Sequence, residues 1–241
     1  MWRSADVDLS QRVPPHELPE WMDGECSYEE FRDCLRSLRR VNRWFLGYRP
    51  TMAWLKHLPR NRQEPIRILD VGSGGGDLLR EIARWSKRRG VAVELTGIDL
   101  NPHCARAAME STPDELHISW VTGDAMEYRR LQRIDIVVSS LTAHHLEDAE
   151  IVRLLRWLEE TAQLGWFIND LERGEWSYRL FGLLPWHSMV RHDGPVSFRR
   201  AFRTEDWQNL LSAAGIPESV VTLERWRPGR LCVGRWKRSA S

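Results

Sequence analysis

The sequence predicts an α/β protein with a mostly parallel, seven-stranded sheet, and three observations support this prediction. Short apolar, β-branched runs alternate with longer segments of helical periodicity. Several of these runs end in an acidic residue or in glycine, as expected where strands pass into ligand-binding turns. The last two runs flank Pro228 and Gly229, which predicts an antiparallel hairpin near the C-terminus.

The apolar runs place the strands. We expect them at residues 66–71, 93–99, 117–121, 134–139, 164–169, 220–226 and 231–236. The first five alternate with helical segments, and parallel strands require such crossover connections. Ligands of sheets of this kind bind at the carboxyl ends of the strands.

Capping patterns place several helices. Ser27 and Glu30 have the spacing of a capping box, and a second helical segment covers residues 41–57. Near the C-terminus a helix begins with Thr204 as its cap and ends at Gly215. Residues 1–20 show little periodicity, so we expect them to wrap around the surface or to be mobile, and to carry no identifiable chemistry.

These elements divide the chain into two parts. Residues 1–62 form an N-terminal segment and a helical cap over the active site, and residues 63–241 form the α/β domain. This domain carries a long insertion at about residues 172–202, and long insertions at a ligand-binding edge are commonly lids.

A glycine-rich turn follows the first strand. Residues 70–77 read Asp-Val-Gly-Ser-Gly-Gly-Gly-Asp. Glycine permits positive φ angles and lets a ligand approach the backbone without a Cβ in the way. The next strand ends in Asp99, whose carboxylate can accept hydrogen bonds from both ribose hydroxyls. Together the two features predict a site for a nucleoside cofactor, and the turn lacks the third glycine of a dinucleotide fold.

The turn resembles motif I of the class I S-adenosylmethionine-dependent methyltransferases, and later motifs match in order. Asp124 and Ala125 correspond to the family residues that contact the adenine. Residues 141–146 read Leu-Thr-Ala-His-His-Leu, similar to the turn of the ubiquinone and menaquinone C-methyltransferases. The resemblance covers about residues 66–170 and implies a Rossmann-like methyltransferase fold that binds S-adenosyl-L-methionine. The cofactor-binding residues it implies are Asp70, Gly72, Ser73, Gly74, Gly76, Asp99, Leu100, Asp124, Ala125 and Ser139.

Methyl transfer from a sulfonium is an in-line displacement, so the protein must chiefly align the reactants, exclude water and deprotonate the acceptor. An imidazole suits the last task. We consider His144, His145 and His192 as the base, the last of them oriented by Asp193. The alternatives are that the first two orient a loop or pack under the cap, and that Asp193 begins a surface turn. No metal site is expected.

Aromatic residues outside the predicted strands indicate a pocket for a flat aromatic or polyketide-like molecule. The chain contains thirteen tryptophans. Arginines of the insertion, Arg199 and Arg200 among them, are candidates for binding an acidic group. Packing of the cap helices is the alternative role for the aromatic residues. The substrate-binding candidates are Tyr28, Trp44, Trp176, Trp186 and Arg191, with Phe31, Arg43 and Tyr48 as further lid candidates.

Composition sets limits on partners and location. The 241 residues are 42% hydrophobic and carry a formal net charge of +1, which gives no reason to expect nucleic acid as a partner. No apolar run approaches the roughly 20 residues that span a bilayer. The chain opens with Met1-Trp2-Arg3 and not with an apolar segment, and its four cysteines form no Cys-x-x-Cys pair, so we expect a cytoplasmic protein.

Three functions are compatible with these features. The first is a small-molecule methyltransferase of secondary metabolism that acts on an aromatic or polyketide/quinone-like acceptor, with O-methylation favoured over C-methylation. The second is an RNA or protein methyltransferase, although residues 139–142 read Ser-Ser-Leu-Thr in place of the Asn/Asp-Pro-Pro-Tyr motif of amino-directed nucleic-acid enzymes. The third is a non-catalytic module that keeps the cofactor-binding fold. The oligomeric state stays open.

Overall fold

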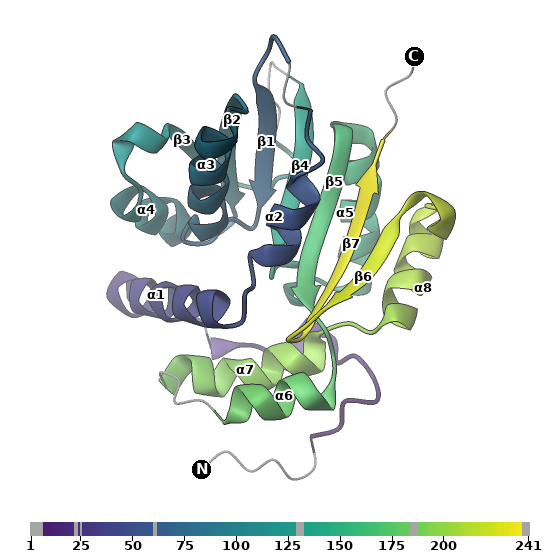
Figure 1. Cartoon of the computed structure of the whole chain (residues 1–241). Coiled ribbons are helices and arrows are strands. Elements are labelled where there is room, and N and C mark those ends of the chain that lie inside the picture. The colour runs from purple at the N-terminus through teal and green to yellow at the C-terminus, as the bar shows by residue number, and fades with distance from the viewer. Residues whose placement is uncertain are drawn as a thin grey trace.

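A seven-stranded sheet lies between two layers of helices in this computed structural model, which describes residues 7–21, 24, 26–59, 62–128, 133–183 and 188–237 (Figure 1). The spatial order is β3-β2-β1-β4-β5-β7-β6, and only β7 runs antiparallel to its two neighbours. The predicted parallel sheet with a C-terminal hairpin is therefore confirmed. The strands are β1 (Ile66–Val71), β2 (Val93–Asp99), β3 (Ile118–Thr122), β4 (Ile134–Ser140), β5 (Ala162–Leu171), β6 (Thr222–Trp226) and β7 (Arg230–Trp236).

Each face of the sheet has its own apolar core. On one face, α2 (Arg49–Leu55) and α3 (Asp77–Arg89) bury their apolar sides against β1, β4 and β5. On the other face, α5 (Asp148–Thr161) and α8 (Thr204–Ala214) pack together around Trp166 and Trp207. The helix α4 (Pro102–Ser111) packs along β2 and β3, with η3 (Asp114–Leu116) after it and η5 (Glu218–Val220) before β6.

A helical layer covers the carboxyl ends of the strands. It contains α1 (Tyr28–Trp44), α6 (Glu175–Gly182) and α7 (Ser188–Arg200), which lie across the lower end of the sheet in Figure 1. Phe45, Phe181 and Phe198 belong to the apolar cluster that holds this layer together. The N-terminal segment, which includes η1 (Pro15–Glu17), runs past α7 and places the start of α1 beside it.

The structure corrects the predicted helix at residues 41–57. The first helix continues to Trp44, and a turn separates it from α2. Leu46 takes a positive φ of 52° there, and Pro50 stands in the first turn of α2, where its missing N–H costs nothing. The Ser27–Glu30 capping box at the start of α1 is present as predicted.

One local prediction near the cap, and one alternative considered beside another, are wrong. Thr204 is the first residue of α8, and Arg203 occupies the capping position, with its backbone N–H bonded to the Asp206 carboxylate at 2.6 Å. Asp193 and Gly194 lie within α7 and form no surface turn. Gly194 is required at its place because a Cβ there would overlap the Phe181 ring. Close packing of α7 on α6 therefore overrides the turn tendency of the Asp-Gly pair.

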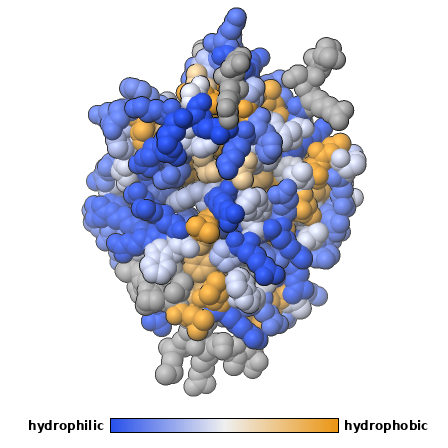
Figure 2. Space-filling view, in the orientation of Figure 1, coloured by the Kyte–Doolittle hydropathy of each residue, from blue (hydrophilic) through white to orange (hydrophobic). Residues whose placement is uncertain are grey.

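Hydrophilic residues cover most of the face shown in Figure 2, and hydrophobic residues form small patches on it. Leu46 and Leu183, two exposed apolar residues, lie in the turns that follow α1 and α6. No helix within the described ranges is long and apolar enough to cross a membrane.

Candidate active site

The glycine-rich turn after β1 is shaped by its own backbone and by one neighbour. Gly72 and Gly74 adopt φ angles of 69° and 51°, a region that residues with a Cβ seldom occupy. A Cβ at Gly72 would also collide with the Thr142 side chain, which follows β4. The Thr142 hydroxyl lies 3.3 Å from the carbonyl oxygen of Val71. The loops after β1 and β4 are thereby fixed against each other.

Asp99, at the end of β2, stabilises the same turn by a hydrogen bond. Its Oδ2 accepts a hydrogen bond from the Gly74 N–H at 2.9 Å, and its Oδ1 accepts one from the Asn101 N–H at 3.0 Å. Each carboxylate oxygen can accept a second bond. The geometry therefore leaves acceptor capacity for ribose hydroxyls on a carboxylate that the backbone already orients.

Asp70, at the end of β1, is a buried acid on the cavity wall. Burial raises the pKa of Asp70 well above its usual value, and the nearby Asp99 carboxylate adds to this effect. Among the described residues Asp70 Oδ1 has no hydrogen-bond partner. A cationic or hydrogen-bond-donating ligand would satisfy this atom, which fits the ammonium group of S-adenosylmethionine.

The loop after β3 forms the opposite side of the cofactor region. Asp124 Oδ1 accepts a hydrogen bond from the Met126 N–H at 2.8 Å, so the loop folds around its own carboxylate. Asp124, Ala125 and Met126 line the cavity together with Leu100, whose side chain is exposed. A flat ring bound between Leu100 and Ala125 would meet apolar side chains on both faces and the Asp124 carboxylate at its edge.

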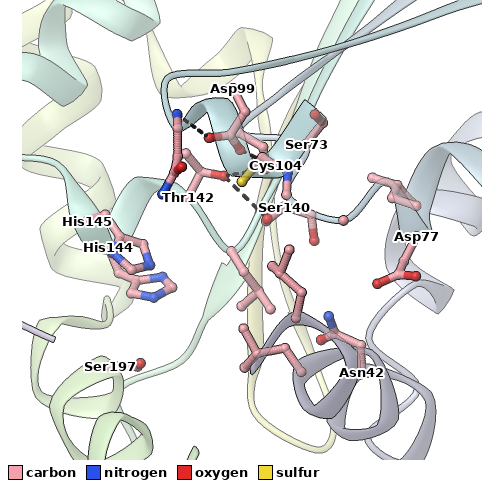
Figure 3. A pocket seen from close by; sticks show the side chains of 18 of the residues that line it. Asn42, Ser73, Asp77, Asp99, Cys104, Ser140, Thr142, His144, His145 and Ser197 are labelled. Atoms are coloured by element: carbon pink, nitrogen blue, oxygen red, sulfur yellow. Dashed lines mark hydrogen bonds between the residues drawn. The ribbon is translucent and has the colours of Figure 1, made fainter. Parts of the chain in front are cut away.

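A cavity of about 520 Å³ opens at the carboxyl ends of β1 and β4, where the strand order reverses. In Figure 3, Asp99 and Ser73 lie at one end of it, His144, His145 and Ser197 at another, and Asn42 of α1 across from the histidines. The cap supplies most of the apolar lining. These cap residues include Phe31, Leu35, Leu38, Val41, Phe45, Tyr48, Phe181, Val190 and Phe198.

The cap is also bound to the glycine-rich turn by charges. Arg39 of α1 lies 3.4 Å from the Asp77 carboxylate, and Asp77 also pairs with Arg80. Arg80 donates in addition to the carbonyl oxygen of Gly75 at 2.7 Å. Burial raises the pKa of Asp77 although both guanidinium groups oppose this rise. These contacts join α1, the turn and the start of α3.

His144 is held from behind by Asp170. The ring Nδ1 lies 2.6 Å from Asp170 Oδ1, and the backbone N–H of His144 bonds to Asp170 Oδ2 at 3.3 Å. A carboxylate only accepts, so the Nδ1 of the neutral ring carries the proton and Nε2 carries the lone pair. This Nε2 lies on the other side of the ring, 3.9 Å from Glu20 Oε1.

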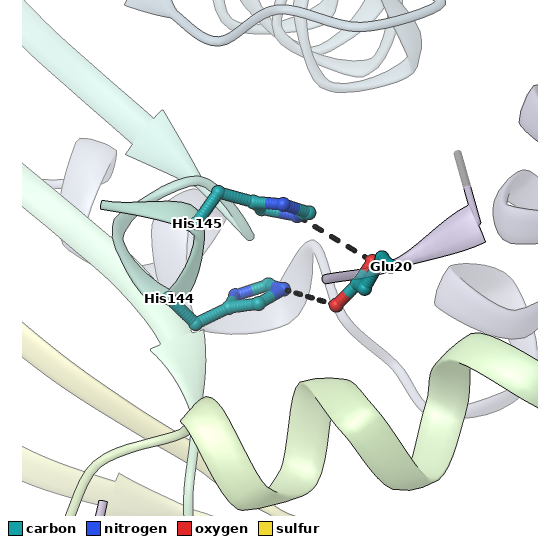
Figure 4. Close-up of side chains that lie close together, drawn as sticks. All are labelled: Glu20, His144 and His145. Carbon is teal, nitrogen blue, oxygen red and sulfur yellow. Dashed lines mark ion pairs between the residues drawn. The ribbon is translucent and has the colours of Figure 1, made fainter. Parts of the chain in front are cut away.

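His145 has different neighbours. Its Nδ1 lies 3.5 Å from Nη1 of Arg200, which can only donate, so the proton of the neutral ring is on Nε2. That nitrogen faces Glu20 Oε2 at 3.9 Å. Figure 4 shows the two rings one above the other, both directed at Glu20 from the N-terminal segment. Two consecutive histidines therefore carry their protons on opposite nitrogens.

Glu20, His144 and His145 each offer one metal-ligand atom, and these atoms lie within 4.8 Å of one another. The Arg200 guanidinium, however, lies 3.4 Å from Glu20 and beside His145. A second cation would be repelled there, and His145 would need its proton on the nitrogen that faces the arginine donor. The cluster is better suited to hold a proton than a metal ion.

Most of the residues expected to bind the cofactor line this cavity, and two do not. Gly76 caps α3 with a φ of 76° and lets the Trp120 ring approach closely. Ser139 is buried and bonds to the carbonyl oxygen of Val71 at 2.9 Å, which joins β4 to β1. Within the described residues their role is to shape the site. The residues in the lining are Asp70, Gly72, Ser73, Gly74, Asp99, Leu100, Asp124 and Ala125.

The expected substrate-binding residues lie elsewhere. Tyr28 packs against α4, where its hydroxyl bonds to Glu110 at 2.6 Å. Trp44 and Trp176 are 72% and 58% exposed, and Arg191 is exposed on α7. None of these four residues lines the cavity in the part of the chain that the structure describes. Trp186 falls outside the described residues.

His192 is also outside the cavity lining that the described residues form. Its ring is half exposed, packs against Trp21 at 4.9 Å and lies 2.9 Å from Asp193. The expected His192–Asp193 pair therefore exists, but Asp193 alone of the two reaches the cavity wall.

Two candidate site residues were not expected from the sequence. Glu20 comes from the segment expected to carry no chemistry, and it is 4% exposed. Asp170 was seen only as the end of the predicted domain body. A signal for Asp170 was present, because it is one more acid at the end of a parallel strand, like Asp70 and Asp99. No comparable signal marks Glu20.

Residues 68–163 match the family model described as methyltransferase domain. This match, the glycine-rich turn and the sheet order are those of the class I S-adenosylmethionine-dependent methyltransferase superfamily. Within it, the chain is similar to trans-aconitate 2-methyltransferase of Streptomyces avermitilis, with 31% identity over 121 residues. That alignment covers 48% of this chain and 43% of the relative, so the chain matches less than half of that protein.

Solved structures share the fold at lower identity. Human N-acetylserotonin methyltransferase in complex with S-adenosylmethionine superimposes with a TM-score of 0.64 at 18% identity, over 94% of this chain and 61% of that one. The plantazolicin methyltransferase BpumL, in complex with a pentazolic substrate analogue and S-adenosylhomocysteine, gives a TM-score of 0.57 at 15% identity, over 85% of each chain. These likenesses establish the methyltransferase fold.

Proposed function

We propose that this protein binds S-adenosyl-L-methionine and methylates a small, aromatic or polyketide/quinone-like acceptor. The observation that carries the proposal is the joining of two regions in one cavity: the acids that follow β1, β2 and β3, and the histidine turn that follows β4. The bound cofactor supplies a methyl group on a sulfonium sulfur, which keeps the electron pair when the acceptor takes the methyl.

In the cofactor region, the residues at each strand end bind a different part of the cofactor. Asp99 accepts from the ribose hydroxyls, since the backbone N–H groups of Gly74 and Asn101 hold its carboxylate in place. Asp124 and Leu100 bind the adenine. Asp70 faces the ammonium group, which would supply the missing partner of its Oδ1. The assignment of Asp124 to the adenine is the one that the family resemblance implies.

The acceptor binds between the histidine turn and the cap. Apolar residues of α1, α6 and α7 enclose this part of the cavity and exclude water. His144 is the base, because Asp170 holds its Nδ1 proton and leaves Nε2 able to take a second one. His145 is a donor, because the Arg200 contact leaves its proton on Nε2. This division favours a hydroxyl acceptor, hence O-methylation over C-methylation.

Several observations bear on the other functions considered. The net charge of +1 offers no general field for nucleic acid, and the solved relatives named above act on small molecules according to their descriptions. The buried Asp170–His144–Glu20 arrangement is costly for a module without catalytic activity, since buried charges need partners. We also propose a cytoplasmic location, because the four cysteines form no Cys-x-x-Cys pair.

Calorimetric titration of S-adenosylmethionine and S-adenosylhomocysteine tests the proposal. We expect micromolar binding by the wild type, at least a tenfold loss in Asp99→Ala and no loss in Asp114→Ala, an exposed acid on η3. Methyl transfer from radiolabelled cofactor to a panel of phenols would then identify the acceptor class. A folded wild type that binds neither compound would overturn the proposal.

A further inference from the structure

The N-terminal segment is held across the site by contacts on two sides. The Arg12 guanidinium bonds to the carbonyl oxygen of Leu146 at 2.7 Å, and the His16 N–H bonds to the Glu147 carboxylate at 3.1 Å. Further along, the Trp21 N–H bonds to Asp193 of α7 at 2.8 Å. Between these attachments the chain places the Glu20 carboxylate in front of the two histidine rings, on the Nε2 side of both.

Burial of this carboxylate is compensated by contacts. The Ser197 hydroxyl donates to Glu20 Oε1 at 2.7 Å, and Arg200 lies 3.4 Å from the same oxygen. A buried acid is retained where its charge is paired or used. Glu20 also faces the two imidazoles at 3.9 Å, beyond hydrogen-bond distance but well within range of electrostatic attraction.

The Glu20–His144 relationship depends on the proton. While the ring is neutral, its Nε2 lone pair points towards an anionic carboxylate, which is unfavourable. After His144 takes up a proton, the imidazolium lies between two carboxylates, Asp170 on the Nδ1 side and Glu20 on the Nε2 side. Glu20 therefore stabilises the protonated ring more than the neutral one.

We propose that Glu20 is a positioning residue that assists acceptor deprotonation by stabilising the protonated form of His144. The inference rests on the proposed function, because it assigns the proton lost by the acceptor hydroxyl to Nε2 of His144. One proton leaves the acceptor and one arrives on the ring, so the cluster gains a single positive charge.

The other charges around His144 determine how strongly Glu20 stabilises the protonated ring. Arg200 of α7 partly neutralises Glu20, whereas Arg230 and Arg12 attract Asp170, and Arg12 is also paired with Asp148. His145 packs against the ring at 4.3 Å and is itself titratable. Removal of the Glu20 charge takes away one of the two carboxylates beside the His144 ring and leaves the Arg200 guanidinium nearby, and this change disfavours a protonated His144.

The test compares Glu20→Gln with Glu20→Asp and Glu17→Gln. The first variant removes the charge at nearly constant shape, the second keeps it, and the third removes an exposed charge from the same segment. We expect NMR of the imidazole nitrogens to show a smaller protonated fraction of His144 at a given pH in Glu20→Gln than in the wild type, because the nearby negative charge is gone. The two other variants should titrate close to the wild type.

Activity gives a second readout. The acid limb of the kcat/KM profile should move to lower pH with Glu20→Gln, and the plateau should fall about tenfold, with cofactor affinity unchanged. If Glu20→Gln does not fold, Glu20→Ala provides another neutral side chain. An unchanged His144 titration in a folded, cofactor-binding neutral variant overturns the inference. Loss of the proposed function is distinguished by a wild type that binds no cofactor, because the NMR titration requires no turnover.

Discussion

Nδ1 of His144 lies 2.6 Å from Oδ1 of Asp170, and both side chains are buried at the end of β5. Burial alone raises the pKa of Asp170, but the attraction of His144 and the hydrogen bonds from His144 and the Leu171 N–H outweigh this and lower it. The pair thus fixes the orientation of the ring that faces the cavity and keeps the carboxylate ionised.

Asp170→Asn should destabilise the protein by about 2 kcal/mol at pH 7, because it removes the charged acceptor of a buried hydrogen bond from His144. The lowered pKa of Asp170 means that its ionisation stabilises the folded state above about pH 4 and that this contribution is lost as the pH falls further. The difference in unfolding free energy between wild type and variant should therefore shrink below pH 4. Urea unfolding at pH 3, 5 and 7 measures it, and a constant difference would contradict the assignment.

Asp70→Asn should have the opposite effect on the protein without ligand. Because the pKa of Asp70 is raised by burial, the unfolded chain loses this proton at lower pH than the folded one, and stability falls as the pH rises above about 4. The amide carries no such cost, so the variant should melt a few degrees higher at pH 7, by a margin that grows between pH 4 and 7. Thermal unfolding across this range is the measurement. Cofactor affinity should fall, and a variant that melts lower at pH 7 would refute the argument.

Gly72→Ala should be more harmful than Gly90→Ala, although both glycines have similar φ angles of 69° and 65°. Each substitution places a Cβ in the left-handed region at a cost of about 1–2 kcal/mol. Only at Gly72 does the new Cβ also meet Thr142, whereas nothing lies within 4 Å at Gly90. We expect lower stability for both variants and weakened cofactor binding for Gly72→Ala alone. Equal calorimetric affinities would show that the approach of Thr142 does not matter.

Phe198→Ala should affect the acceptor site, and Trp44→Ala should not. Phe198 is buried on the cavity wall, with its ring 5.6 Å from that of Phe181. Truncation of such a side chain costs about 3–5 kcal/mol and enlarges the cavity, so the acceptor KM should rise while cofactor affinity stays constant. The exposed Trp44 should contribute within about 0.5 kcal/mol. Urea unfolding and acceptor KM values for both variants show whether the acceptor site is formed by the buried aromatic residues of the cavity or by the exposed ones expected from the sequence.

The cofactor side of the site was predictable because its chemistry is local. A strand, a turn that needs positive φ and the next helix lie within about twenty residues, so Gly72, Gly74 and Asp70 carry their signal in the sequence around them. Asp99 repeats the pattern one strand later. The hydrophobic pattern that predicted the strands also predicted that these residues lie at the carboxyl ends of neighbouring strands. The structure confirms this arrangement.

The acceptor side could not be predicted in the same way. Trp44 and Phe198 are both aromatic residues of cap helices, but the packing of α1 on α4 and of α7 on α6 turns one outward and the other onto the cavity. The side of a helix that becomes buried depends on what packs there. Local sequence contains no information about that partner when it comes from a distant segment.

The sequence by itself determined the parallel sheet, its C-terminal hairpin and the position of acids and glycines at the strand ends, because periodicity and turn chemistry act over a few neighbouring residues. Tertiary structure alone decided that Glu20 and Asp170 face opposite sides of His144 and that His145 faces Arg200. Electrostatic contacts of this kind depend on distance in space, and the path of the chain brings those residues together from the N-terminal segment, β5 and α7.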